Sequence, residues 1–248
     1  MAETTLSIDE KERSGQVSRR EFLKNAGLIA CGAAVGSMAV LSTQTKTTTV
    51  TTPGSTTTTT VTATSKPETK GATLSEALRN RKSASAFQSQ PLSKEKLLEL
   101  LWAAWGINRP DSGKRTAPTA MNTQEIDIYV LLPDGVYVYD AKGNQLALVL
   151  AQDLRTKTGS AGVVKDAPVH LLFVADYAKY RAIPQSQKEL YSAAHTGFIG
   201  QNVYLYCASE GLAARFYAGV DRATLKDSLK LRNDQAIVFA QAVGYSKE

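Results

Sequence analysis

Hydrophobic and polar positions alternate with two different periods along residues 71–248, and these periods predict both helices and strands. Residues 93–105 carry apolar side chains at helical spacing, with Ser93 as the predicted N-cap and Gly106 after the last turn. A longer helical pattern covers residues 187–210. Shorter helices are predicted over 74–82 and 223–231.

The strand pattern is clearest around the turn Pro133-Asp134-Gly135. Residues 125–132 and 136–140 alternate at period two on either side of it, which predicts a hairpin. The apolar run at 169–174 predicts a central strand that is buried on both faces. Further strands are predicted at 146–150 and 236–243, with strand or loop at 213–218. This mixture, with an adjacent hairpin, favours an α+β fold over a doubly wound sheet.

The first 41 residues follow neither pattern. The segment SRREFLK at 18–24, with its paired Arg19-Arg20, resembles a twin-arginine export signal and precedes an apolar stretch at 26–41. This stretch has 16 residues, fewer than the roughly 20 of a spanning helix, and it lacks the polar face of an amphipathic helix. We therefore expect residues 1–41 to be a signal that the twin-arginine export machinery recognises.

The apolar stretch also contains Leu28-Ile29-Ala30-Cys31, which resembles a lipobox and would make Cys31 a lipidation site. An uncleaved anchor, or cleavage further along the chain, is the alternative. Thr occupies 14 of the 24 positions of 42–65, so we expect 42–70 to be a disordered linker. The protein is then expected to be exported and extracytoplasmic, with the folded domain at 71–248 anchored close to a membrane.

Composition narrows the candidate chemistry. The net charge of +6 falls to +4 in residues 71–248 without a dense Lys/Arg run, which argues against nucleic-acid binding. The two cysteines and two histidines, Cys31, Cys207, His170 and His195, show no metal-ligand spacing. His195 is expected to be a packing or surface residue, and His170, in the buried strand, a core residue. Since the chain has no nucleophile elbow, phosphate-binding Gly loop or dinucleotide fingerprint, an enzyme of this sequence would rely on a bound cofactor.

Residues 81–87, RKSASAF, resemble the Arg-x-Ser-x-Arg-x-Phe pattern of the nitroreductase superfamily. In that family the polar residues of the pattern hold the phosphate of FMN, and a phosphate needs cations and hydroxyl donors. Arg81 and Ser83 match the pattern, whereas Ser85 stands where the second Arg would be. The resemblance implies that Lys82, or a residue elsewhere in the chain, supplies the missing charge.

Residues 118–124, PTAMNTQ, resemble the family's Pro-Ser-x-x-Asn-x-Gln segment, which implies that Asn122 hydrogen-bonds the flavin ring. The preceding residues 113–118 and the segment 102–106 are similar to the SagB-type dehydrogenase branch. In the same branch a Lys-Tyr pair resembles Lys179-Tyr180, which could assist proton removal. A surface turn after the strand at 169–174 is the alternative for this pair.

Two later stretches extend the resemblance over residues 74–245. Residues 197–202, followed by Gly211-Leu212 and Gly219, resemble the family's helix with Gly-x-x-x-Gln-Asn and its later Gly. They imply that Gln201 lies at the cofactor and that the backbone N–H of Gly219 faces flavin N5. Val243-Gly244-Tyr245 resembles the closing Gly-Tyr, after which Lys247 is left to reach the phosphate.

The resemblance implies an α+β fold with a mixed sheet flanked by helices. It also implies a homodimer that binds FMN between its subunits. The activity would be a ping-pong transfer of two electrons from a small-molecule donor to an organic acceptor. The alternative is a surface-displayed module of the same fold that has lost flavin binding, which Ser85 and the short segment after Tyr245 favour.

Overall fold

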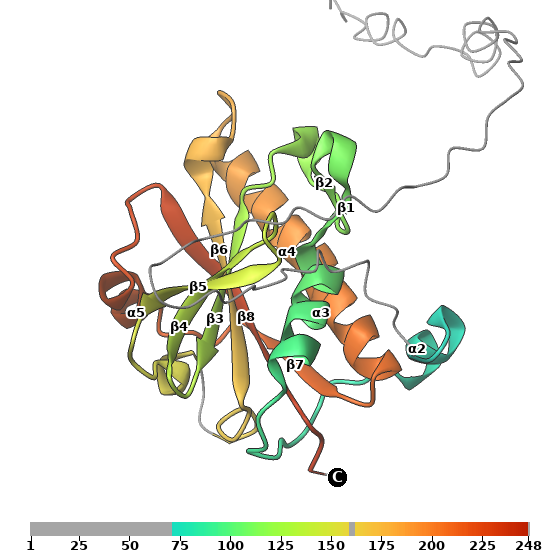
Figure 1. Ribbon diagram of the computed structural model, residues 1–248. Coiled ribbons are helices and arrows are strands. Elements are labelled where there is room, and N and C mark those ends of the chain that lie inside the picture. Colours follow the sequence, from blue (N-terminus) through green and yellow to red (C-terminus); the bar gives the residue numbers. More distant parts are fainter. Residues whose placement is uncertain (1–70, 159–161, 248) are drawn as a thin grey trace, which may run out of the picture. The chain divides into compact units, whose positions relative to one another are not determined.

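The computed structural model describes residues 71–158 and 162–247, so the predicted signal and linker at 1–70 lie outside the described residues. Its centre is a six-stranded sheet in the order β5-β4-β3-β6-β8-β7 (Figure 1). The strands are β3 (Ile126–Leu132), β4 (Gly135–Asp140), β5 (Gln145–Leu150), β6 (Val169–Asp176), β7 (Ala213–Tyr217) and β8 (Gln235–Gly244). All of the strands predicted in 71–248 are present, and the hairpin of β3 and β4 closes at the pair Leu132 and Gly135.

The pairings within this sheet differ from the expected mixed sheet, because every neighbouring pair of strands is antiparallel. The chain returns through the short helix α5 (Arg222–Ser228) and inserts β8 between β6 and β7, opposite in direction to both. Among the described residues, the parallel component is confined to an isolated bridge between Ser83 and Ala214. The α+β class is confirmed.

The strand β6 lies inside the sheet and all eight of its residues are buried, which confirms the prediction of a central strand. Successive side chains point to opposite faces. Leu171 and Phe173 join the hydrophobic core that includes helix α3 (Lys94–Trp105) and helix α4 (Gln185–Ser209). Leu172 and Val174 join the core on the other face, beneath α5.

The helices begin and end close to the predicted residues. Ser93 Oγ accepts a hydrogen bond from the N–H of Lys96 at 3.2 Å, as expected of an N-cap. The 25-residue helix α4 packs along α3, and Gly211 just beyond its end has a φ of 68° (Figure 1). The helix α2 (Leu74–Asn80) opens the described part of the chain. The segment after α3 contains two short strands, β1 (Ile107–Arg109) and β2 (Lys114–Arg115). Within the described ranges, no helix combines the length and apolar character needed to span a bilayer.

A buried polar cluster joins His170 on β6 to Tyr217 on β7, two strands that β8 separates, and to Thr158. His170 Nδ1 lies 2.6 Å from Thr158 Oγ1 and 2.8 Å from the Tyr217 hydroxyl, and these two hydroxyl groups are 3.0 Å apart. Burial lowers the pKa of His170 to about 4, so the ring is neutral at neutral pH. His170 is therefore a core residue, as predicted.

The depressed pKa of His170 predicts that stability is lost in acid. In the unfolded chain this side chain titrates near its usual pKa of about 6.5. Between that value and about 4 the unfolded state binds a proton that the native state does not bind. The neutral His170 ring therefore contributes about 3 kcal/mol to the free energy of unfolding above pH 6.5, and this contribution disappears as the pH falls to 4. Urea unfolding at pH 7 and pH 4 should show a smaller pH dependence in His170→Gln. An equal pH dependence in both proteins would contradict this assignment.

Candidate functional site

The segment that resembles the ring-binding motif is a strained loop. Met121, Asn122 and Gln124 have φ values of 55°, 54° and 50°, in the left-handed region that residues other than glycine seldom adopt. The short 3-10 turn η2 (Ala120–Asn122) includes two of them. Strain of this kind persists only where the surrounding structure enforces it. The contacts of residues 119–124, which we call the ring loop, show what enforces it.

The first anchor of the ring loop is a buried pair, Glu125 and His195. His195 Nδ1 lies 2.6 Å from Glu125 Oε1, and both side chains are almost completely buried. The N–H of Ala120 donates to His195 Nε2 at 2.8 Å. Because a backbone N–H can only donate, Nε2 is the acceptor, and the ring proton of neutral His195 is directed from Nδ1 to Glu125.

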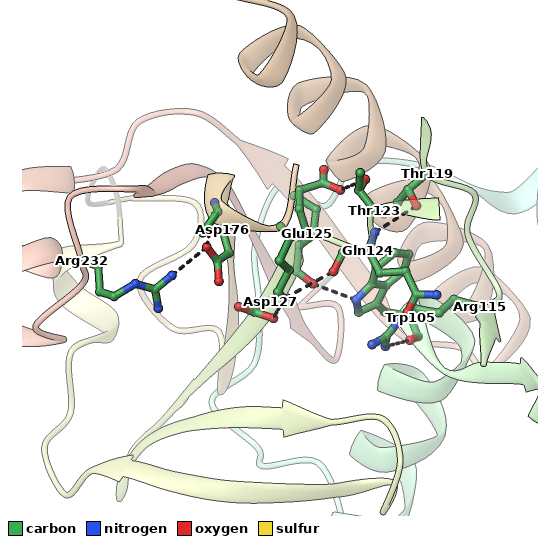
Figure 2. Close-up of polar contacts among 12 residues, drawn as sticks. Trp105, Arg115, Thr119, Thr123, Gln124, Glu125, Asp127, Asp176 and Arg232 are labelled. Carbon is green, nitrogen blue, oxygen red and sulfur yellow. Dashed lines mark hydrogen bonds and ion pairs between the residues drawn. The ribbon is translucent and has the colours of Figure 1, made fainter. Parts of the chain in front are cut away.

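Glu125 also holds the ring loop directly, since Thr123 Oγ1 donates to its Oε2 at 2.8 Å (Figure 2). Burial acts to raise the pKa of this carboxyl, but the hydrogen bonds from His195, its own backbone and Thr123 together lower it. Glu125 is therefore an ionised carboxylate at neutral pH. The prediction that His195 is a packing or surface residue missed its role. An acidic residue at the start of a buried strand, which requires a buried partner, was the available signal.

The second anchor is Arg115, which follows the short turn after β1. Its guanidinium lies 4.6 Å from the centre of the Trp105 ring, and Nη1 donates to the Trp105 carbonyl at 2.8 Å. Nε donates to Gln124 Oε1 at 2.7 Å (Figure 2). Gln124 Nε2 in turn lies 3.1 Å from both the Gly113 carbonyl and Asn122 Oδ1. Asn122, the predicted ring contact, is exposed at the end of this chain of hydrogen bonds.

The predicted phosphate residues lie at a different place, beside the first half of β7. The N–H of Ala84 donates to the Ala214 carbonyl at 2.9 Å and lines up residues 81–87 with this strand. Ser83 Oγ lies 2.9 Å from the Tyr204 hydroxyl, and the Arg81 guanidinium lies 5.3 Å from the centre of the Tyr204 ring. Arg81 and Ser83 therefore both contact the side chain of Tyr204 on α4. Lys82 and Ser85 are exposed on the same segment.

Two further basic residues contact residues 81–87 from distant parts of the chain, Lys247 through its main chain and Arg215 through its side chain. The backbone N–H of Lys247 lies 3.4 Å from the Ala86 carbonyl, next to a bridge between Phe87 and Ser246. Arg215, on β7, donates from Nη1 to the Ala84 carbonyl at 2.9 Å. The contact of the Lys247 side chain with a phosphate stays a prediction, and Arg215 was not predicted. A cation in an otherwise small and aromatic strand, AARFY, was the signal for Arg215.

Gly219 and Gln201 are not brought to the phosphate residues. Gly219 is exposed in the loop after β7 and lines a pocket of about 450 Å³ with the segments 156–157 and 218–222. A Cβ added to Gly219 would meet no atom within 4 Å, so the fold of one chain does not require glycine there. Its contact with flavin N5 stays a prediction. Gln201 lies on the exposed side of α4.

The two small residues of the same motif have different surroundings. A Cβ added to Gly200 would lie 2.7 Å from the Phe216 ring, so close packing of α4 against β7 requires this glycine. Gly197 faces open space and is exposed. Of these two glycines, Gly200 alone allows close packing of the helix.

The structure gives Lys179 and Tyr180 separate partners. Lys179 ends the 3-10 turn η4 (Tyr177–Lys179) and forms an ion pair with Asp127 at 2.8 Å. The Tyr180 hydroxyl is buried 3.2 Å from Ser192 Oγ, and burial raises its pKa. The turn described as the alternative is present, and a joint catalytic role for the two side chains stays a prediction. Within the described ranges, no group of side chains is suited to hold a metal ion.

Comparison with known proteins places these features in a family. The model of the nitroreductase family matches residues 78–245. A protein of Methanocaldococcus jannaschii, named as a candidate nitroreductase, is 28% identical over 174 residues, covering 64% of this chain and 87% of its own. The crystal structure of a candidate nitroreductase from Ralstonia eutropha is 40% identical with a TM-score of 0.70, over 73% of this chain and 87% of the other.

A third similar structure shares the fold at lower identity. It is a candidate nitroreductase from Desulfovibrio desulfuricans, described as a complex with FMN. It is 21% identical, with a TM-score of 0.52 over 71% of this chain and 87% of the other.

The buried pair predicts a large cost for removing His195. His195→Leu leaves the Glu125 carboxylate without its closest partner and the Ala120 N–H without an acceptor, so we expect a loss of about 3–5 kcal/mol in the free energy of unfolding. Tyr191→Phe is the control, because it keeps the ring that stacks on His195 and removes only the hydroxyl group of a half-buried side chain. Its effect should stay within about 0.5 kcal/mol. Equal stability of the two variants in urea unfolding would refute the anchor.

Proposed function

The chain belongs to the nitroreductase family, and from this premise we propose that it is an FMN-dependent oxidoreductase. It would transfer two electrons from a small-molecule donor to an organic acceptor in two half-reactions. The observation that carries the proposal is the set of cations and hydroxyl groups along residues 81–87. FMN supplies the hydride chemistry when it is bound, and the protein supplies binding, orientation and exclusion of water.

The donor groups along residues 81–87 fit a phosphate. Arg81, Arg215 and Lys247 contribute cations, and Ser83 contributes a hydroxyl group beside the Tyr204 hydroxyl. A pocket of about 260 Å³ opens beside them, lined among others by Lys82, Ala84 and Ser246. Arg215 compensates for the arginine that is missing at Ser85. Ser85 therefore gives less support to the alternative of a module that has lost flavin binding.

The flavin ring would lie at Asn122 and Gly219, the residues that the family motifs assign to the ring. Asn122 is presented by a loop whose backbone is held by two independent anchors. Gly219 follows β7, about 17 Å along the chain from Ala214 at the extended rise per residue. A ligand with a phosphate at one end and a ring at the other suits this separation. In this arrangement the side chains hold and orient the ring, and few of them need to react.

A homodimer is part of the proposal, because the outer face of α4 is apolar and exposed. Leu190 and Phe198 are 66% and 47% exposed, and Gly197 and Gln201 lie on the same side. Exposed apolar surface of this kind is typical of an interface. A second copy on this face would enclose a flavin that one chain leaves open, and Gln201 would then lie between subunits. This supports the expected FMN site between two chains.

Export is the remaining part of the proposal. Arg19-Arg20 would direct the folded protein to the twin-arginine machinery, and residues 42–70 would link a domain of 71–248 to a lipid at Cys31 or to an uncleaved anchor. FMN is available in the cytoplasm, and a route for folded proteins would keep it bound. Outside the cytoplasm a membrane quinol or a redox protein is a more suitable donor than a nicotinamide nucleotide. Within the family we propose the SagB-type branch, since Trp105 and Arg115 from its characteristic segments support the ring loop.

Removal of the phosphate cations should weaken FMN binding. Arg81→Ala and Arg215→Ala should each cost about 1.5–3 kcal/mol of binding free energy, the range for a hydrogen bond to a charged group. Arg181→Ala is the control, because Arg181 is exposed after η4 and does not belong to residues 81–87 or β7. Fluorescence titration of flavin-free protein with FMN measures the three dissociation constants. Unchanged FMN affinity in Arg81→Ala and Arg215→Ala, or FAD rather than FMN in mass spectrometry of the purified protein, would overturn the site.

Replacement of Arg19-Arg20 by Lys-Lys tests the export route. The variant should accumulate in the cytoplasm as folded, yellow protein, because the signal is no longer recognised while the domain that binds FMN is unchanged. Cell fractionation with absorbance at the flavin bands measures both properties. Normal export of the Lys-Lys variant would show that the signal is of another kind.

A further inference from the structure

We infer that Gln124 and Arg115 are positioning residues that fix the direction of the Asn122 side-chain amide. Asn122 then presents its N–H groups, and not its oxygen, to the bound flavin. The inference rests on the proposed FMN function. It goes beyond that function because it assigns two residues that do not touch the ligand, and because it predicts which kind of flavin atom Asn122 contacts.

The direction of the Gln124 amide follows from partners whose roles cannot change. Arg115 Nε can only donate, and it lies 2.7 Å from one end of the Gln124 amide, which must therefore be the oxygen. The Gly113 carbonyl can only accept, and it lies 3.1 Å from the other end, which must therefore be the nitrogen. The two constraints agree, so the hydrogen-bond partners alone determine which end of the Gln124 amide is oxygen and which is nitrogen.

The direction of the Asn122 amide follows from that of Gln124. Gln124 Nε2 is a donor and lies 3.1 Å from Asn122, so the atom that faces it is the oxygen Oδ1. The nitrogen Nδ2 then points away from Gln124 and has no hydrogen-bond partner among the described residues. Since Asn122 is exposed, its two N–H groups are available to a ligand. The flavin atom at this place must be an acceptor, such as a ring carbonyl oxygen, and cannot be the N3–H donor.

Arg115 keeps this arrangement rigid. Its guanidinium is held by the Trp105 ring at 4.6 Å and by the Trp105 carbonyl at 2.8 Å, both on the end of α3. The backbone N–H of Gln124 donates to Thr119 Oγ1 at 3.2 Å (Figure 2). Gln124 is therefore fixed at both its main chain and its side chain. A ligand that met Asn122 would find the amide already oriented, without the cost of ordering it on binding.

Gln124→Glu reverses the direction of Asn122 while conserving shape. A carboxylate at this position still accepts from Arg115, but it cannot donate to Asn122 Oδ1. The Asn122 amide then turns so that Nδ2 donates to the carboxylate and Oδ1 faces the ligand. An oxygen would oppose a flavin acceptor, so the variant should bind FMN no better than a protein without the Asn122 side chain.

The test is a double-mutant cycle on the full-length, flavin-free protein, with dissociation constants from FMN fluorescence titration. Asn122→Ala and Gln124→Glu should each raise the constant about 10-fold, the upper range for one hydrogen bond. The double variant should also lie about 10-fold above wild type, because Gln124 acts through Asn122. Gln152→Glu adds the same charge at an exposed position beyond β5 and should leave the constant unchanged. The midpoint potential of the bound flavin should fall in both single variants, since a donor to a ring acceptor stabilises the electron-rich reduced form.

The outcomes separate the inference from the function on which it rests. A double variant about 100-fold above wild type would show two independent effects and overturn the inference. So would Gln124→Glu with wild-type affinity and potential while Asn122→Ala weakens binding, or Asn122→Ala without effect on a protein that binds FMN. A wild-type protein that does not bind FMN at all would overturn the proposed function and the inference together.

Discussion

The buried hydrogen bond between Glu125 and His195 determines how the sheet, the long helix α4 and the ring loop meet. A carboxylate is costly to bury unless it is well paired, and here its partners come from both α4 and the loop. His195 transmits this constraint to the loop through the Ala120 N–H. The left-handed backbone at Met121 and Asn122 is stable because these contacts leave it no freedom to relax. The exposed Asn122 is thus a rigid feature on a strained segment.

A second constraint acts at the other end of the proposed site. Main-chain hydrogen bonds and bridges hold residues 81–87 to β7 and the segment before Lys247 to residues 86–88, so that Arg81 and Arg215 lie along one segment. Among the described residues, neither Arg81 nor Arg215 has a carboxylate in an ion pair. Like charges held close together repel, and an anion bound between them relieves the repulsion. This is the physical reason for which we propose that the phosphate of FMN binds at this place.

The elements of the fold follow from local patterns, whereas the site depends on contacts that the sequence does not display. Periods of two and of about 3.6 residues predict the strands and helices of 71–248, because burial of one face imposes them. The motif identifies Arg81 and Ser83 by their spacing. Arg215 could not be predicted from the motif, because it lies on β7, 131 positions after the Ala84 carbonyl that it contacts. Lys179 and Tyr180 are adjacent in sequence, yet their side chains meet different partners, which spacing alone cannot reveal.

In the proposed complex a single FMN joins the cations at residues 81–87 to an Asn122 amide. A crystal structure of the protein with FMN measures this most directly. We predict the phosphate within hydrogen-bond distance of Arg81, Ser83 or Arg215. We also predict a ring acceptor facing Nδ2 of an Asn122, from the same subunit or from a second copy that packs on α4. A phosphate bound away from residues 81–87, or a ring that touches no Asn122, would contradict the account.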